Sequence, residues 1–259
     1  MKRIASLLFF LFFFLQGNLY SQKPTVTNTG ADTLNRTDAS GNKFGYWEEK
    51  QGEILFQGTY ELNKKSGNWV SFFPNKIISG IVYYSDGVKD GISVQFDRRG
   101  KILEISYFKA GKLHGQSLSY TQTGDLPVSE IFYVNGKKEG LYRISYDNGK
   151  IQEESFYKDD KKNGTSKWYT KNGHLVAEYN YKEGNFDGAQ KTFYPSDTLQ
   201  SLKTYSNNQL SGISREYYSN GKVRESGNYI NGNKEGAWTE YDESGKLLKT
   251  TKYKAVKNK

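Results

Sequence analysis

The sequence predicts an all-β protein, an elongated antiparallel meander of about nine tandem β-hairpins that form one twisted or coiled sheet. Two observations predict this fold. A glycine recurs nine times at intervals of 22–25 residues, which is the spacing of a repeat array. Short runs rich in aromatic and β-branched residues flank Asn-Gly pairs, which is typical of β-hairpins. We call these nine residues the leading glycines and number each unit from its own: they are Gly45, Gly67, Gly91, Gly115, Gly140, Gly164, Gly188, Gly212 and Gly236.

The first 21 residues have the pattern of a secretory signal peptide. Lys2 and Arg3 precede an apolar run over residues 4–15, and Ser21 provides a small residue at the expected cleavage site. The run is shorter than the roughly 20 apolar residues of a membrane span, although an uncleaved anchor is the alternative. We therefore expect an exported protein, periplasmic or extracellular. Residues 22–41 are small and polar, and predict a flexible leader.

The repeats occupy residues 42–254 and are followed by a basic tail over residues 255–259. A second glycine recurs at position +9 in most units, and aliphatic and aromatic residues recur at +11 and +17. The +9 glycines are Gly100, Gly124, Gly149, Gly173, Gly221 and Gly245. Each unit is too small to bury its own apolar face, so neighbouring units have to pack against each other.

The pattern also indicates how each hairpin is closed. A three-residue loop that ends in a left-handed glycine at +9 places position +5, usually aromatic, opposite the aliphatic residue at +11. A two-residue loop would put these two positions on opposite faces. We therefore expect the three-residue loop, with the rings at +5 and +17 forming the core of the sheet.

Positions +6 and +16 supply further rings, which we expect on the other face. Coiling or dimerisation covers this face, or it is available to a ligand. Tyrosine and tryptophan carry binding energy well because they are rigid and have a polar end, and the rings at these positions are the candidate binding residues. They are Tyr83, Tyr107, Phe132, Tyr146, Phe156, Tyr194 and Tyr218, and Phe73 lies at +6 of unit two.

Lysines gather in two series, one before the leading glycines and one after the hairpin tips. The meander places these series on its two long edges, where they are expected to attract an anionic lipid surface, a cell-wall polymer or an acidic partner. The alternative is that they keep the turns soluble. The candidates before the leading glycines are Lys64, Lys65, Lys137, Lys138, Lys161 and Lys162.

The composition argues against several functional classes. The chain has 259 residues, a net charge of +9, no cysteine and two histidines. The absence of cysteine excludes a disulfide scaffold, a thiol nucleophile and a thiolate metal site. His114 and His174 fall in turns of different edges, so we expect no metal site, no cofactor and no enzymatic activity. Nucleic acid is not expected as a partner, because the rings have core spacing.

The repeated pattern resembles the bacterial variant of the MORN repeat (membrane occupation and recognition nexus). Residues 212–232 and 236–241 carry this resemblance, and residues 38–47 look like the opening of exported members; the likeness covers residues 38–254. The sequence departs from the pattern at Pro74, Pro127 and Pro195. The resemblance implies a non-enzymatic hairpin array that binds proteins or membranes, and many bacterial relatives carry the label of antitoxin. We therefore expect an unidentified protein partner, with a homodimer through a sheet face as a further option.

Overall fold

The computed structural model describes residues 34–121 and 126–254, which form twenty strands in one sheet. The strands of the first half are β1 (Arg36–Thr37), β2 (Lys43–Gln51), β3 (Ile54–Glu61), β4 (Lys64–Phe72), β5 (Ile78–Ser85), β6 (Val88–Phe96), β7 (Ile102–Lys109), β8 (Lys112–Tyr120), β9 (Pro127–Val134) and β10 (Lys137–Ser145). Those of the second half are β11 (Ile151–Lys158), β12 (Lys161–Lys162), β13 (Gly164–Tyr169), β14 (Leu175–Lys182), β15 (Asn185–Phe193), β16 (Leu199–Ser206), β17 (Gln209–Tyr217), β18 (Val223–Ile230), β19 (Asn233–Tyr241) and β20 (Leu247–Tyr253).

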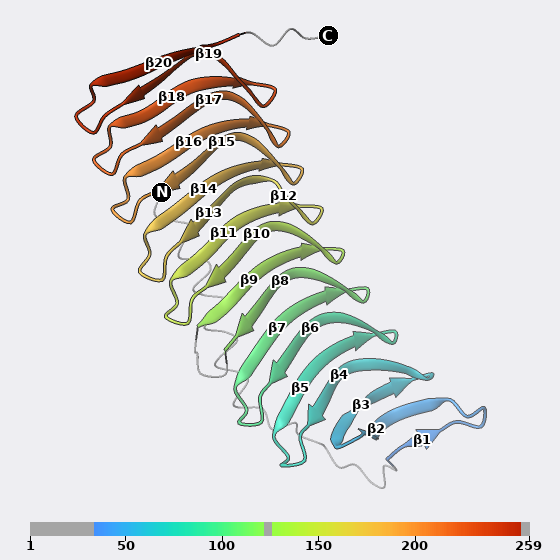
Figure 1. Ribbon diagram of the computed structural model, residues 1–259. Coiled ribbons are helices and arrows are strands. Elements are labelled where there is room, and N and C mark those ends of the chain that lie inside the picture. Colours follow the sequence, from blue (N-terminus) through green and yellow to red (C-terminus); the bar gives the residue numbers. More distant parts are fainter. Residues whose placement is uncertain (1–33, 122–125, 255–259) are drawn as a thin grey trace, which may run out of the picture.

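The strands follow one another as an antiparallel meander, which confirms the predicted fold class. Each strand pairs with its neighbours in the chain, and β12 and β13 both pair with β11 as one interrupted strand. Figure 1 shows the units stacked along one axis, with hairpin tips on one long edge and the turns between units on the other. None of the described residues forms a helix long and apolar enough to cross a membrane. The predicted signal peptide, most of the leader and the basic tail lie outside the described residues.

The end of the predicted leader adds a short strand to the array. Arg36 and Thr37 of β1 pair with Phe44 and Lys43 of β2. Just before them, Asn35 donates its backbone N–H to the carbonyl of Tyr46. The outer edge of β2 is therefore hydrogen-bonded over much of its length, which protects it from pairing with another chain.

The hairpin tips confirm the expected register. Phe72 faces Ile78, Phe96 faces Ile102, and the remaining units with three-residue loops repeat this +5 to +11 pairing. The +9 glycines among the described residues have left-handed backbones, as at Gly100 (φ 83°). Lys76 (φ 64°) and Asp197 (φ 62°) take the same conformation, so the proline-containing tips keep the common turn. Unit one differs from them in having a two-residue loop, with Gln51 facing Ile54.

A second kind of turn joins each unit to the next. Its two residues both have positive φ, as in Asp86 (φ 51°) and Gly87 (φ 83°), which is the type I′ geometry of two-residue hairpins. The second turn residue donates its N–H to the preceding unit, for example from Gly87 to the carbonyl of Lys65 at 2.9 Å. The units are thus hydrogen-bonded to each other along this edge as well as through the strands.

Every leading glycine has a positive φ, and those of units two to nine lie in bulges. In the β5–β6 pair, Val82 faces Ser93 and Tyr84 faces Lys89, so three residues of β6 lie opposite Tyr83 alone. Gly91 in this bulge has a φ of 142°, which only glycine adopts without strain. Two extra residues in one strand of the pair bend that strand and increase its twist.

The bend gives the single sheet two unequal faces. Neighbouring residues of one strand differ sharply in exposure: Ser106 is 1% exposed whereas Tyr107 is 36%, and Ser155 is fully buried whereas Phe156 is 44% exposed. We call the face of Ser106 the concave face and the face of Tyr107 the convex face. The +17 rings lie on the concave face, where Lys65 contacts both Tyr84 and Trp69.

The expected single core of +5 and +17 rings was wrong. Position +4 lies on the concave face, since Glu49 binds Lys43 there, and position +5 follows it on the convex face because side chains alternate along a strand. The register shift between +4 and +5, seen between Ser71 and Phe72, carries +11 to the convex face as well. The +5 and +17 rings therefore stabilise opposite faces.

Large and small side chains complement each other on the concave face. Trp69 and Trp238 are each 3% exposed, and their rings lie directly over Gly58 and Gly227. A Cβ atom added at Gly58 would lie 2.4 Å from the nearest atom of the Trp69 ring. The glycine therefore provides the space that the tryptophan occupies.

Replacing Lys76 with glycine is expected to stabilise the protein. A left-handed backbone costs a non-glycine residue about 1–2 kcal/mol, part of which is offset by the greater flexibility of unfolded glycine, so we expect a net gain of about 0.5–1 kcal/mol. Equilibrium urea unfolding measures it. Gly100→Ala at the matching position of the next tip is the control and should destabilise. An unchanged or lowered stability of Lys76→Gly would contradict the assigned turn.

Gly58→Ala is expected to destabilise the protein by about 1–3 kcal/mol, because the added methyl group overlaps the Trp69 ring and forces the core apart. Thermal and chemical unfolding check this result. Gly67→Ala is a comparison variant in which no atom lies within 4 Å of the added Cβ, so that any loss comes from its positive φ alone. A loss at Gly58 of only a few tenths of a kcal/mol would argue against the tryptophan–glycine packing.

Candidate functional site

Rings at position +16 form a column on the convex face of β5, β7, β9 and β11. Tyr83 is 41% exposed, Tyr107 36% and Phe156 44%, while Phe132 between them is half-buried. Each ring lies beside the leading glycine of the next unit, as Tyr83 does at 3.1 Å from the position of a Gly91 Cβ. A Cβ at Gly91 would press on the Tyr83 ring, whereas a Cβ at the other three glycines would make ordinary contacts of 3.6–3.9 Å with the ring beside it.

Aliphatic residues widen this column in the N-terminal half of the array. Residues at +3 face residues at +14 on the next strand: Val70 faces Ile81, and Val94 faces Ile105. Further along, the same positions carry charges: Arg143 binds Glu130 and Glu154, each at 2.8 Å. The convex face thus changes from apolar to charged along the array. We call its apolar part, with the four rings, the convex patch.

The candidate tyrosines at +6 have a structural role instead. Tyr146, Tyr194 and Tyr218 are half-buried, and each hydroxyl donates a hydrogen bond to a backbone carbonyl of the next unit. The acceptors are the carbonyls of Tyr169 at 2.9 Å, Tyr217 at 2.7 Å and Tyr241 at 2.8 Å. These tyrosines join the hairpin tips to one another and do not belong to the convex patch.

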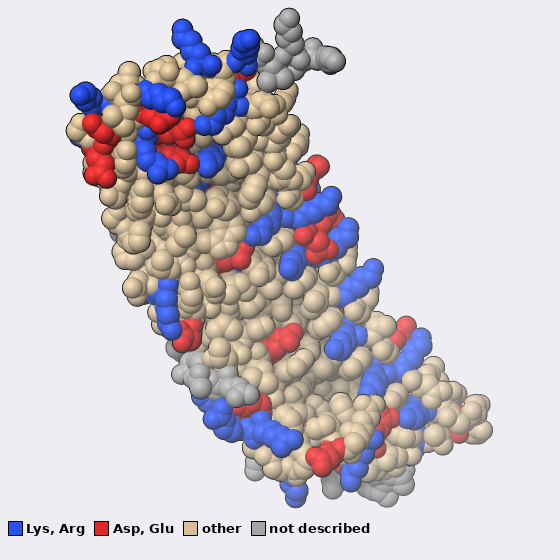
Figure 2. Space-filling view, in the orientation of Figure 1, with Lys and Arg blue, Asp and Glu red and all other residues tan. Residues whose placement is uncertain are grey.

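The lysine pairs divide between an edge and a face. Lys64, Lys137 and Lys161 are exposed at the edge formed by the turns between units, where Figure 2 shows Lys and Arg side chains gathered. Acidic residues of the next turn partner two of them, since Lys64 binds Asp86 at 2.6 Å and Lys137 binds Asp159 at 2.9 Å. The net charge of this edge is therefore lower than its lysine count suggests.

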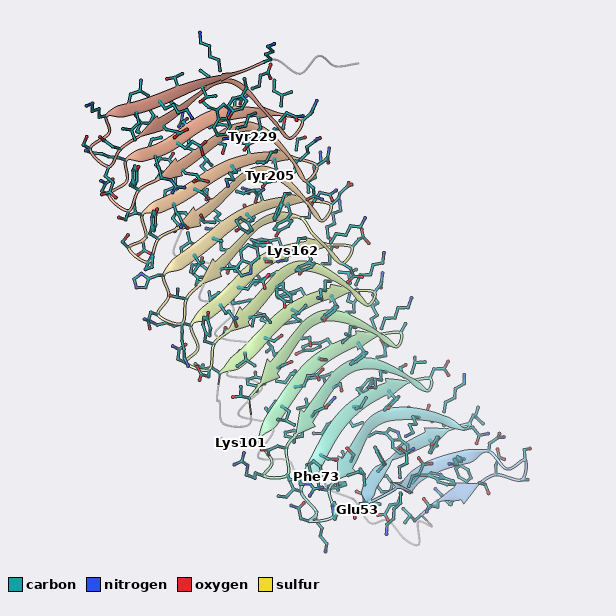
Figure 3. All side chains as sticks on the ribbon, viewed as in Figure 1. Glu53, Phe73, Lys101, Lys162, Tyr205 and Tyr229 are labelled. Atoms are coloured by element: carbon teal, nitrogen blue, oxygen red, sulfur yellow. The ribbon has the colours of Figure 1, made fainter. Side chains whose placement is uncertain are left out.

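The second lysine of each pair lies over the rings of the concave face. Lys65 is 3.8 Å from the centre of the Trp69 ring, Lys162 is 4.4 Å from Trp168, and Lys138 is 5.1 Å from Tyr142. Figure 3 shows Lys162 within the body of the sheet, whereas Lys101 lies at the hairpin tips. Such cation–π contacts stabilise the fold and occupy the ammonium groups that were expected on the edge.

The same packing raises the pKa of buried tyrosines. Tyr60 is 8% exposed and lies between Trp47 and Trp69, with ring centres 5.6 and 5.0 Å away. Its burial, together with the hydrogen bond that its hydroxyl donates to Glu49, raises its pKa to about 12. Burial likewise raises the pKa of Tyr157 to about 12. These phenols stay protonated far above their usual range.

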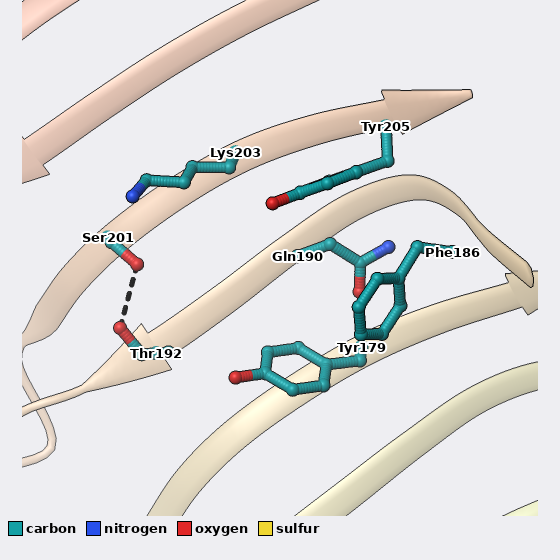
Figure 4. Close-up of a pocket in the computed structure, with 7 residues that line it drawn as sticks. All are labelled: Tyr179, Phe186, Gln190, Thr192, Ser201, Lys203 and Tyr205. Carbon is teal, nitrogen blue, oxygen red and sulfur yellow. Dashed lines mark hydrogen bonds between the residues drawn. The ribbon is translucent and has the colours of Figure 1, made fainter. Parts of the chain in front are cut away.

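A hollow of about 230 Å³ opens on the concave face between units six and seven. Tyr179, Phe186 and Tyr205 form its walls, and Gln190, Thr192, Ser201 and Lys203 complete it (Figure 4). It opens where the repeat pattern changes. The residue two places before the leading glycine, a lysine in most units, is Phe186 here. Position +15, small or apolar in most units, is Lys203.

The two histidines lie on opposite long edges of the array. His174 contacts Asp197 at 3.0 Å across two hairpin tips, while His114 lies at the opposite edge near the backbone of Asn135. Within the part of the chain that the structure describes, no three His, Asp or Glu side chains gather closely enough to hold a metal ion.

Comparison with known proteins supports the repeat assignment. Five segments match the family model of the MORN repeat variant: residues 138–159, 162–183, 186–207, 210–231 and 234–255. Each begins two residues before a leading glycine and so corresponds to one of units five to nine. No curated protein matches the chain.

One solved structure to which the chain is similar is that of TcdB2-TccC3 without its hypervariable C-terminal region, at 14% sequence identity and a TM-score of 0.23. The match covers 83% of this chain and 12% of that one.

Alkaline pH is expected to destabilise the protein through its buried tyrosines. The pKa of tyrosine is near 10 in the unfolded chain, whereas that of Tyr60 in the folded protein is about 12. The contribution of Tyr60 to the free energy of unfolding is therefore complete below pH 10 and is lost as the pH rises through 12. Urea unfolding across this range measures the loss. Tyr60→Phe should lose less stability than the parent chain over the same range; parallel curves would contradict the assignment.

Proposed function

We propose that this protein is a non-enzymatic scaffold that binds another protein through the convex patch. The observation that supports it most is the column of Tyr83, Tyr107 and Phe156, each more than a third exposed. Rings exposed in a row on a rigid sheet offer binding area at a small cost in conformational entropy. A partner with an apolar strand or helix face fits this surface.

The proposal includes export of the chain and an antitoxin-like role, in which the partner is a toxin that the scaffold neutralises. The resemblance to antitoxin-labelled MORN-variant proteins supports this form of it. Binding to anionic lipid or a cell-wall polymer stays a separate prediction, and the geometry favours it less. Many of the lysines expected to form its two ladders bind acidic side chains, cover rings or donate to backbone carbonyls, as Lys150 does to Asn172 at 2.7 Å.

Affinity capture with paired variants tests the proposal. The tagged chain is incubated with an extract of its source cells and washed above about 0.3 M salt, where screening removes most surface electrostatics. We expect one protein to be retained, and Tyr107→Glu with Phe156→Glu to reduce its recovery at least tenfold. Thr204→Glu places the same charge at the same repeat position outside the patch and should leave recovery unchanged.

Three outcomes would count against the proposal. Equal losses in all variants would indicate a general effect of charge, and retention unaffected by the patch variants would place the interface elsewhere. Self-association of the purified chain that Phe156→Glu abolishes, measured by light scattering, would assign the patch to a homodimer.

A further inference from the structure

The hollow between units six and seven differs from the rest of the concave face in its free polar groups. Tyr179 and Tyr205 make no hydrogen bond through their hydroxyls to any described residue, whereas the +6 tyrosines all donate one. Tyr179 and Tyr205 line the hollow together with Thr192 and Ser201 (Figure 4). Four residues with hydroxyl groups therefore line one small space.

The ammonium group of Lys203 is the single positive charge among the lining residues. Its acidic partner is Glu216, at 3.4 Å, which is longer than a good charged hydrogen bond. Arg224 also contacts Glu216 and makes the closer ion pair. The ammonium group of Lys203 therefore retains N–H donors for an anionic ligand. Glu216 stays paired with Arg224 when Lys203 binds that ligand.

The remaining lining is rigid. Phe186 packs between Tyr179 and Tyr205, with ring centres 5.4 and 5.5 Å away. Gln190 is 5% exposed, and its amide binds backbone groups of Asn180 and Gly188, so it forms a fixed floor. Thr192 and Ser201 bind each other at 2.7 Å, as the dashed line in Figure 4 shows. The walls are thus held by contacts within the protein before any ligand arrives.

We infer that this hollow is a binding site for an acidic sugar, with the uronic acid class as its ligand. Tyr179, Phe186 and Tyr205 provide apolar faces for the C–H side of a sugar ring, and the hydroxyls of Tyr179, Tyr205, Thr192 and Ser201 pair with sugar hydroxyls. Lys203 binds the carboxylate. A flat aromatic carboxylate would contact the rings and Lys203, but it would leave the polar rim unpaired, which lowers affinity.

This inference is independent of the proposed function, because the hollow lies on the concave face and the scaffold surface on the convex face. The sheet separates the two, so each can fail without the other. The site is small and open, and we expect it to hold one sugar unit with weak, millimolar affinity.

The test is a heteronuclear NMR titration of the whole chain with sodium glucuronate, glucose and sodium benzoate as separate probes. Glucuronate should shift the amides of β14–β17 and bind at least tenfold more tightly than glucose. Lys203→Met should weaken glucuronate binding about tenfold, the loss expected for one charged hydrogen bond. Lys191→Met is the matched control, since Lys191 lies on the neighbouring strand and binds Glu178 at 2.8 Å on the convex face.

Tyr205→Phe keeps the ring and removes one free hydroxyl, so it should weaken glucuronate binding severalfold while the spectrum of the fold stays the same. Three results would overturn the inference. These are the absence of shifts with glucuronate, equal binding by the parent chain and Lys203→Met, and benzoate binding as tightly as glucuronate. The last result would assign the hollow to aromatic acids instead.

Discussion

A single-layer sheet has no second layer to cover either face, so it must bury side chains by bending on itself. The leading glycines make this bend. Each adopts a positive φ, those of units two to nine lie in bulges with two extra residues, and the strands curve at the same place in successive units. The contrast between buried Ser155 and exposed Phe156 follows from this curvature. So do the ring packing of the concave face and the exposed column of the convex face.

The curvature also gives the two faces different roles. On the concave face, lysine, aromatic and glutamate side chains satisfy one another, as Lys43, Tyr60 and Glu49 do, and little is left for a partner. The exception is the hollow at Tyr179 and Tyr205. On the convex face, rings that the bend forces outward have neighbours only beside them. The surface available for binding is therefore greatest on the convex face, where the bend exposes apolar side chains. On the concave face it is restricted to the hollow, where the repeat pattern changes.

Much of the fold was predictable from the repeat alone. The recurrence of +5, +9 and +11 determined the loop length, and the structure pairs Phe96 with Ile102 as expected. The rings at +16 were correctly placed on the face opposite +17. The spacing could not show that Lys64 lies on the edge and Lys65 on the concave face, because that depends on where β4 begins. It also could not show that the Tyr146 hydroxyl reaches the carbonyl of Tyr169. Lys203 and Phe186 depart from the residue types usual at their repeat positions. That they line a hollow together depends on which positions face the concave side.

The unfolding free energy of Gly164→Ala tests the central role of the leading glycines most directly. Gly164 has a φ of 106°, and the nearest atom to an added Cβ is 3.7 Å away, so a methyl group fits and only the backbone is strained. The account predicts a loss of about 1–3 kcal/mol, the cost of a sparsely populated backbone conformation. A loss of a few tenths of a kcal/mol would show that the bend does not depend on glycine at this position.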